Sequence, residues 1–361
     1  MAKTARKPSI PRKLEPMEAR LVSELPTGTG WQFEPKWDGF RCVVFRSGNR
    51  VELQAKSGKP LSRYFPEVVA RVKALRPEQF ALDGELATPV GDSLSFDALQ
   101  MRLHPAESRI KKLSVGTPAT LMLFDCLFDA DGKRLLAQPF ESRRTALEKF
   151  FGGLKSTDGL VLTPYTRDRR VAEKWLNDAG GALDGVIAKQ LDLPYSSGER
   201  ALLKVKRLRT ADCVVGGFRY GVDSKEVASL LLGLYNTEGL LDHVGFTSAI
   251  AKKDRKALTA KLEKLRGEPG FTGDAPGGPS RWSTERSAEW QPLQSKLVVE
   301  VCYDHVSGDR FRHGTRLLRW RPDKAPSQCT FEQLQREARP AKLLKKLLAS
   351  TAGTARRKQR R

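Results

Sequence analysis

The stretch Trp31–Arg41, WQFEPKWDGFR, places a lysine where a solvated surface lysine is not expected. Lys36 stands between Pro35 and Trp37, two residues before an Asp-Gly pair. A lysine that acts as a nucleophile needs its free amine, and the ordinary lysine pKa of about 10.4 leaves almost none of it at neutral pH. Apolar surroundings and neighbouring cations favour the uncharged amine. We therefore interpret Lys36 as a residue held for chemistry, in a loop between two strands.

Length and composition predict two domains with substantial hydrophobic cores. The chain has 361 residues, too many for one compact core of usual size, and 39% of them are hydrophobic. No apolar run reaches the roughly 18 residues that a membrane-spanning helix needs. The basic N-terminus MAKTARKPSIPRK has no apolar segment behind it, unlike a secretory signal. We therefore expect no membrane partner and a cytoplasmic, nucleoid-associated protein.

The cysteines indicate buried thiols in a reducing compartment. None of the five is spaced as CxxC, and four lie in apolar, strand-like runs. This pattern favours small buried side chains over a disulfide framework or a zinc site. The residues are Cys42, Cys126, Cys213, Cys302 and Cys329.

The charge of the chain predicts a polyanionic partner. The formal net charge is +22 and the isoelectric point is near 10.0. A field of that sign attracts polyanions, and contacts to nucleic-acid phosphates make binding strongly salt-dependent. A charge that serves solubility alone is the alternative.

Residues 14–208 form the first predicted domain, after a flexible basic arm over residues 1–13. Strands are expected on both sides of the Lys36 loop, and a helix is expected over residues 65–75 because Pro66 marks a helix start. The other expected strands cover residues 80–88, 119–128, 183–191 and 201–208, and the other helices cover 95–103, 142–151 and 171–180. Gly180 and Gly181 are expected to cap the last helix.

Residues 209–339 form the second predicted domain. Five strand-like runs, over residues 213–221, 228–236, 240–248, 296–306 and 310–321, enclose one helical segment over 252–266. Five strands with one helix favour a five-stranded oligonucleotide-binding (OB) barrel. Residues 340–361 are expected to form a basic helix and tail. The fold class is therefore α+β: antiparallel sheets with flanking helices, followed by an OB-fold barrel.

Acids and lysines recur at spacings that suggest phosphate chemistry. Asp83 and Glu85 are two residues apart on one expected strand, and with Asp184 they offer oxygen ligands for a divalent cation. Lys204 and Lys206 alternate on another strand, and Lys189 lies five residues after Asp184. A metal, several cations and an activated lysine together point to attack on a phosphate and a lysyl-phosphate bond.

The order of six motifs resembles that of the covalent nucleotidyltransferases. Within that superfamily the chain resembles the ATP-dependent DNA ligases, most of all the small bacterial type with an adenylation domain and an OB-fold domain. The resemblance covers roughly Leu14 to Phe331, and six motifs in one order make it specific. They are KWDGFR at 36–41, LDGELA at 82–87, LFDCLF at 123–128, LDGVIAK at 183–189, LLKVKR at 202–207 and RWRPDK at 319–324.

The resemblance implies a role for each residue of the first domain's motifs. Lys36 is the expected nucleophile, which attacks the α-phosphate of ATP and becomes lysyl-AMP. Glu34 and Trp37 are expected near the adenine and Arg41 at the ribose. The remaining assignments are Glu85 at the ribose or the metal, Phe124 stacked on the adenine, Asp184 at the metal, and Lys189, Lys204 and Lys206 at the α-phosphate.

The resemblance also assigns part of the second domain. Arg321, Asp323 and Lys324 are expected to engage the β- and γ-phosphates during self-adenylylation. The implied cofactors are ATP and Mg²⁺ or Mn²⁺. Two plain structural alternatives stay open, because Phe124 fits an ordinary core position and residues 321–324 fit a surface turn.

Two residues depart from the family pattern. Asp184 stands where many ligases carry a glutamate, so its shorter side chain shifts the expected metal distance or favours Mn²⁺. Lys56 stands where an arginine is usual, and lysine lacks the bidentate fork that grips a phosphate. Lys56, Arg63 and Arg200 are the candidate DNA contacts.

The expected function is sealing of nicks between a 3′-hydroxyl and a 5′-phosphate, in DNA repair. The expected partners are nicked double-stranded DNA and repair proteins, the expected state is a monomer, and a hinge is expected over residues 207–212. Three alternatives are kept: an RNA ligase, a GTP-dependent capping-type nucleotidyltransferase, and a non-catalytic DNA-binding OB-fold protein.

Overall fold

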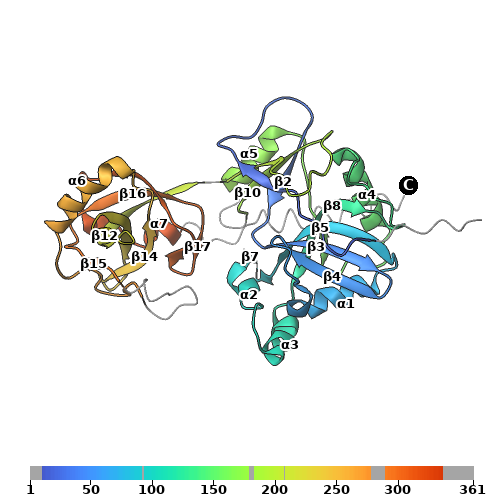
Figure 1. Cartoon of the computed structure of the whole chain (residues 1–361), viewed down its shortest axis with the longest axis horizontal. Helices are drawn as coiled ribbons and strands as arrows, with labels where there is room; N and C mark the ends of the chain where they lie inside the picture. Colours follow the sequence, from blue (N-terminus) through green and yellow to red (C-terminus); the bar gives the residue numbers. More distant parts are fainter. Residues whose placement is uncertain (1–9, 92, 179–182, 207, 278–288, 336–361) are drawn as a thin grey trace, which may run out of the picture. The chain divides into compact units, whose positions relative to one another are not determined.

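The computed structural model describes residues 10–91, 93–178, 183–206, 208–277 and 289–335. Contacts within the chain define two compact units that meet in the sequence at Lys206 and Arg207 (Figure 1). Most of the predicted basic arm, the glycine cap at Gly180 and Gly181, and the predicted helix and tail over residues 340–361 lie outside the described residues. The first 206 residues and the unit that follows are described separately.

One sheet of the first unit carries the Lys36 strand. Its order is β1 (Ala19–Leu21), β11 (Leu202–Val205), β10 (Gly185–Gln190) and β2 (Trp31–Lys36). Strand residues alternate between two faces, and Phe33, Val186 and Ala188 pack on one face with Trp175 of helix α5 (Arg169–Asp178). The alternate residues, which include Glu34 and Lys36, therefore face the other way.

The second sheet of this unit has the order β4 (Arg50–Ala55), β3 (Phe40–Ser47), β5 (Gln79–Ala87), β8 (Thr120–Phe128) and β9 (Leu160–Leu162). Its outer face is covered by α1 (Pro66–Ala74) and α4 (Phe140–Gly152), which place Val68, Val72 and Phe150 in a shared core with the strands. Its smaller elements are η1 (Ser62–Tyr64), β6 (Pro89–Val90), β7 (Ser93–Leu94), α2 (Phe96–Gln100) and α3 (Glu107–Gly116).

The second unit is a curved sheet with the order β14 (Leu241–Thr247), β13 (Val227–Tyr235), β12 (Arg209–Tyr220), β16 (Val298–Tyr303) and β19 (Arg316–Trp320). A bridge joins Thr247, at the end of β14, to Thr315, the residue before β19, and register shifts in three strand pairs supply curvature. This is the expected OB-type barrel. Its other elements are α6 (Lys252–Glu263), β15 (Gln291–Pro292), β17 (Val306–Ser307), β18 (Arg310–Phe311), η3 (Pro326–Gln328) and α7 (Glu332–Gln335).

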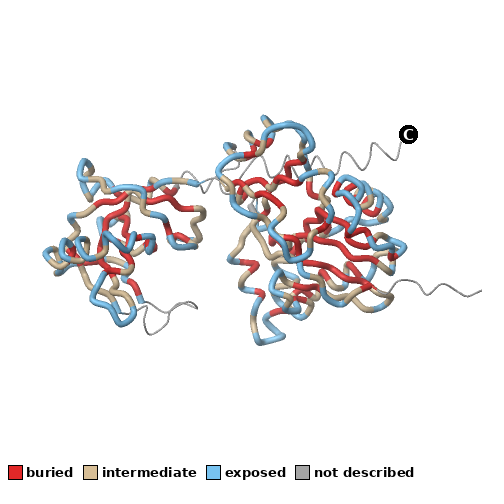
Figure 2. The backbone as a smooth tube through the Cα atoms, turned by 45° about the horizontal axis from the view of Figure 1, so that its top comes forward, coloured by how far each residue is buried: buried red, intermediate tan, exposed pale blue. Residues whose placement is uncertain are grey.

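The predicted α+β class is confirmed, with local corrections. Two strand pairs, β1 with β11 and β8 with β9, are parallel rather than antiparallel. The helix predicted over residues 95–103 is limited to Phe96–Gln100, and α3 was not predicted because only Ile110 in it is buried. The five cysteines are buried and free, as expected. Buried residues follow the strands of each unit in Figure 2.

No helix in the described ranges is both long enough and apolar enough to span a bilayer.

Gly39 tests the backbone packing that shapes the Lys36 loop. A Cβ atom at this position would overlap the carbonyl oxygen of Leu86 in β5, so Gly39→Ala forces the loop away from the second sheet. We expect the variant to lose about 1–3 kcal/mol of stability, seen as a lower melting temperature of the first unit by calorimetry. Gly116→Ala, at the end of α3 with no atom within 4 Å of the added carbon, is the matched control. Equal melting temperatures for the two variants would contradict this packing.

Candidate active site

Lys36 ends strand β2 at the edge of a cavity between the two sheets of the first unit. Its neighbours hold the backbone there: the amide of Asp184 donates to the Lys36 carbonyl at 2.9 Å, and the buried Trp37 indole donates to Thr163 Oγ1 at 3.0 Å. The Lys36 amine contacts the Asp184 carboxylate, and its side chain is 22% exposed. The lysine is therefore accessible from the cavity but fixed in place.

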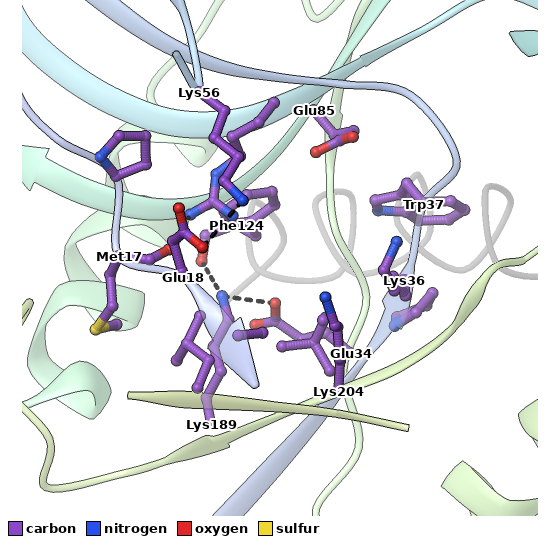
Figure 3. Close-up of a pocket in the computed structure, with 16 residues that line it drawn as sticks. Met17, Glu18, Glu34, Lys36, Trp37, Lys56, Glu85, Phe124, Lys189 and Lys204 are labelled. Atoms are coloured by element: carbon purple, nitrogen blue, oxygen red, sulfur yellow. Dashed lines mark hydrogen bonds and ion pairs between the residues drawn. The ribbon is translucent and has the colours of Figure 1, made fainter. Parts of the chain in front are cut away.

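The first cavity wall is one face of the sheet that contains β2. The strand register sets Glu34 opposite Ile187 and sets Ile187 opposite Lys204. Period-two alternation adds Lys36 and Lys189 to the same face, and all five side chains line the cavity (Figure 3). The motif residues gather here because neighbouring strands carry them in register.

The second cavity wall comes from the other sheet. Arg41 of β3 pairs directly with Glu85 of β5, and Phe124 of β8 lies beside them. The Arg41 guanidinium lies 4.7 Å from the centre of the Phe124 ring, and Lys189 Nζ lies 4.5 Å from it. An aromatic face flanked by cations suits a flat heterocycle joined to a phosphate.

Glu34 is a buried carboxylate in the cavity wall. It accepts hydrogen bonds from Gln32 Nε2 at 2.9 Å and from Lys189 Nζ at 2.7 Å, while Lys189 also donates to the Phe124 carbonyl at 3.1 Å. Burial lowers the pKa of Lys189, although Glu34 opposes that effect. Lys189 thereby ties the two walls together.

The expected metal-binding acids are engaged with cations of the chain. Asp184 contacts Lys36 and lies 3.2 Å from Lys206 Nζ; burial works to raise the pKa of Asp184, but these two lysines outweigh it and lower that pKa. Asp83 is held by Arg41 at 2.6 Å and by the Tyr195 hydroxyl at 2.6 Å. Within the described ranges, no three metal-ligating side chains cluster.

A metal still fits this site through fewer protein ligands. Mg²⁺ commonly uses one or two carboxylates and takes its other ligands from water and substrate phosphates. Glu85 offers a carboxylate in the cavity wall, and burial raises its pKa to about 7, against the opposing effect of Lys36 and Arg41. A bound cation would favour the ionised form of Glu85.

The remaining predicted site residues divide between the cavity wall and positions outside it. Lys56 lines the cavity, but Arg63 and Arg200 do not. Arg63 donates to the Pro105 carbonyl, and Arg200 lies 3.6 Å from Glu18. Arg321 and Lys324 belong to the second unit, where both bind the Asp212 carboxylate, at 2.9 and 2.7 Å.

Comparisons with known proteins decide the family. The profile described as "ATP dependent DNA ligase domain" matches residues 9–206, and that of "ATP dependent DNA ligase C terminal region" matches residues 223–324. The chain belongs to the ATP-dependent DNA ligase family. Family membership implies ATP and a divalent metal, and confirms the predicted enzyme class.

Curated relatives span nearly the whole ligase. The chain is 43% identical over 333 residues to DNA ligase C1 of Mycolicibacterium smegmatis, which covers 89% of this chain and 93% of the relative. It is 40% identical over 339 residues to DNA ligase C of Mycobacterium tuberculosis, covering 90% and 94%. These matches do not favour an RNA ligase, a capping enzyme or a non-catalytic binder.

A solved structure supports the fold of the ligase. A structure from a structure–function study of Lig E DNA ligases aligns with a TM-score of 0.55 and 17% identity, over 84% of this chain and 99% of that one.

Several residues of the ligase site were missed by the sequence analysis. Gln32 alternates with Glu34 and Lys36 on β2, so period-two spacing would have found it. Arg144 lies 3.8 Å from Glu34, and Tyr195 accepts from the Met17 amide at 3.0 Å while it donates to Asp83. No local pattern marks these two, because each meets its partners only in the fold.

Glu85 gives the ligase a pH-dependent stability in buffer without metal or nucleotide. Its pKa is raised from 4.5 to about 7, so the folded protein retains a proton that the unfolded chain has released. This stabilisation is complete below about pH 4.5 and is lost as the pH rises through about 7. We therefore expect the melting temperature of wild type, relative to Glu85→Gln, to fall between about pH 5 and pH 8.

The exposed Glu78→Gln variant is the control and should parallel the wild type. A difference between wild type and Glu85→Gln that stays constant with pH would contradict a raised pKa at Glu85.

Proposed function

We propose that Lys36 is the nucleophile with which this ligase takes AMP from ATP. One observation carries the proposal: Lys36 lines the same cavity as Phe124, Arg41, Glu85 and Lys204. An amine, an aromatic face, a carboxylate and two further cations are the groups that a nucleoside triphosphate and a nucleophilic attack require.

The first step forms a bond from Lys36 Nζ to the α-phosphorus of ATP. The bond from that phosphorus to the β-phosphate oxygen breaks, and pyrophosphate leaves. The Lys36 ammonium, which is paired with Asp184, must first release a proton to solvent so that the free amine can attack. Asp184 then stays paired with Lys206, so its charge is still compensated when Lys36 becomes neutral.

The other residues in and around the cavity have distinct proposed tasks. Phe124 stacks on the adenine, with Glu34 and Trp37 at its edge, and Arg41 lies toward the ribose. Lys189, Lys204 and Lys206 stabilise the charge that develops at the α-phosphate. Burial and the charges of Lys36, Lys206 and Lys56 lower the pKa of Lys204. Such mutual repulsion among cations is relieved when an anionic phosphate enters.

A divalent metal supplies charge neutralisation at the phosphates when it is bound. We propose Glu85 as its carboxylate ligand, with Asp184 as a second ligand once Lys36 has released it. Both Mg²⁺ and Mn²⁺ fit oxygen ligands. The shorter Asp184 side chain is the reason to compare the two ions directly.

The second and third steps act on nicked DNA. AMP passes from Lys36 to the 5′-phosphate, the 3′-hydroxyl then attacks that phosphate, and AMP leaves as the strand is sealed. We propose Lys56, Arg63 and Arg200 as DNA contacts, and Arg321 and Lys324 as contacts to the β- and γ-phosphates in the first step. The proposal extends to a role in DNA repair with repair-protein partners, to a monomeric state, and to a hinge over residues 207–212.

Replacing Lys36 tests the nucleophile. With α-labelled ATP and Mg²⁺ or Mn²⁺, wild type should carry label on a denaturing gel and release it to nicked duplex as the nick is sealed. Lys36→Ala and Lys36→Arg should carry none, and the arginine variant keeps the positive charge beside Asp184. The exposed Lys155→Ala variant is the matched control and should label as wild type does.

Label from GTP in place of ATP would contradict the adenine assignment. Label on Lys36→Arg equal to that on wild type would contradict the nucleophile.

Replacing Lys324 separates the first step from the later ones. Because Lys324 is proposed to bind phosphates that leave as pyrophosphate, Lys324→Ala should slow lysyl-AMP formation at least about tenfold, a loss of about 1.4 kcal/mol of transition-state stabilisation. Sealing of a nick that already carries 5′-AMP should stay within about twofold of wild type, since no pyrophosphate leaves in that step. The control is Arg319→Ala, an exposed cation paired with Glu300. Equal losses in both assays would count against this role.

A further inference from the structure

Two of the proposed DNA contacts share one carboxylate. Glu18 Oε2 lies 3.0 Å from Lys56 Nζ and 3.6 Å from Arg200 Nε. The Lys56 and Arg200 side chains are 59% and 75% exposed, and that of Glu18 is 26% exposed. A carboxylate of the chain itself therefore lies between these two cations.

Glu18 and Lys56 stand where two cavities adjoin. Both residues line the nucleotide cavity, and both line a second cavity whose wall also includes Lys13, Gln54 and Ser57. Figure 3 shows the two side chains reaching toward each other across the rim of the nucleotide cavity. The pair is therefore part of the wall of both cavities.

The Glu18 backbone is held by hydrogen bonds, whereas its carboxylate lies in two solvent-exposed ion pairs. The Glu18 amide donates to the Glu199 carbonyl at 2.7 Å, and the Glu18 carbonyl accepts from the Leu202 amide at 3.0 Å. The hydrogen bond from Lys56 lowers the pKa of Glu18, so the carboxylate is ionised at neutral pH. Solvent-exposed ion pairs contribute little free energy, so a ligand of higher negative charge can compete with such a carboxylate.

The charge of the incoming phosphate decides that exchange. An internal phosphodiester carries one negative charge, the same as the carboxylate that it would replace, so the exchange gains little. A terminal phosphomonoester carries close to two negative charges at pH 7, so it gains attraction to both cations. The carboxylate of Glu18 therefore weakens the binding of internal DNA phosphates more than it weakens the binding of a terminal 5′-phosphate.

We propose that Glu18 is a specificity-determining residue that makes Lys56 and Arg200 select a terminal 5′-phosphate over the internal phosphates of intact DNA. This inference rests on the proposed function, in which Lys56 and Arg200 contact nicked DNA. Glu18 competes with DNA phosphates for Lys56 and Arg200. A terminal 5′-phosphate displaces it more effectively than an internal phosphate does.

The test is binding of the full chain to three labelled duplexes by fluorescence anisotropy. One duplex carries a nick with a 5′-phosphate, one carries a nick with a 5′-hydroxyl, and one is intact; a 3′-dideoxy end prevents sealing. Glu18→Gln is compared with wild type and with Glu15→Gln. Glu15 lines the same second cavity, and its substitution changes the net charge equally.

Wild type should prefer the 5′-phosphate nick. Glu18→Gln should bind the intact duplex and the 5′-hydroxyl nick about fivefold more tightly, with a smaller gain on the 5′-phosphate nick, so that the preference shrinks. For Glu18→Gln and intact duplex, the slope of log K against log salt concentration should also become steeper by about one to two, because Lys56 and Arg200 then contact backbone phosphates. Glu15→Gln should show a small, equal gain on all three duplexes.

Equal gains for Glu18→Gln and Glu15→Gln, or weaker binding of Glu18→Gln to every duplex, would overturn the inference. Labelling of the same preparations with α-labelled ATP separates the two levels of the argument. If both proteins take the label but Glu18→Gln prefers the 5′-phosphate nick as strongly as wild type does, only the role of Glu18 is contradicted. Wild type that takes no label, even after pyrophosphate has removed any bound AMP, defeats the proposed function as well.

Discussion

The site depends on the pairing of buried and partly buried cations with carboxylates in and around one cavity. Lys36 and Lys206 share Asp184, Arg41 is bound by Asp83, and Lys189 is bound by Glu34. An unpaired charge at these depths would be costly, since burial penalises ionised groups by several kcal/mol. Each pair also fixes the position of a cation, so the cavity is assembled for an anion before one arrives.

Two sheets make this arrangement possible. Strand alternation sends apolar residues such as Phe33 and Val186 toward α5 and sends Glu34, Lys36 and Lys189 toward the cavity. The close approach of the loop to β5 at Gly39 carries the chain from Lys36 directly into Arg41, which lies in the opposite wall. Motifs that are far apart in the sequence therefore converge because each one lies at a fixed register in its sheet.

The sequence predicted much of this because strand period and motif order are local properties. The longer strands of both units, the family and the cavity-lining set around Lys36 and Lys204 could be predicted from spacing and resemblance. Short strands such as β1 and β9 were not predicted. The hydrogen-bond and ion-pair partners of these side chains could not be predicted from the sequence. The pairing of Asp83 with Tyr195 joins residues 112 positions apart, and that of Glu34 with Arg144 joins two distant elements. The expected grouping of Asp83, Glu85 and Asp184 differs from the fold for the same reason: cations of the chain hold the first and last.

The central claim is that Lys36, among several buried or partly buried lysines of one cavity, carries the covalent chemistry. The most direct measurement is peptide mapping by mass spectrometry of wild-type protein after incubation with ATP and a divalent metal. The account predicts one added AMP, on the peptide that contains Lys36, and its loss when nicked DNA is supplied. AMP attached to Lys189, Lys204 or Lys206, with Lys36 unmodified, would contradict it.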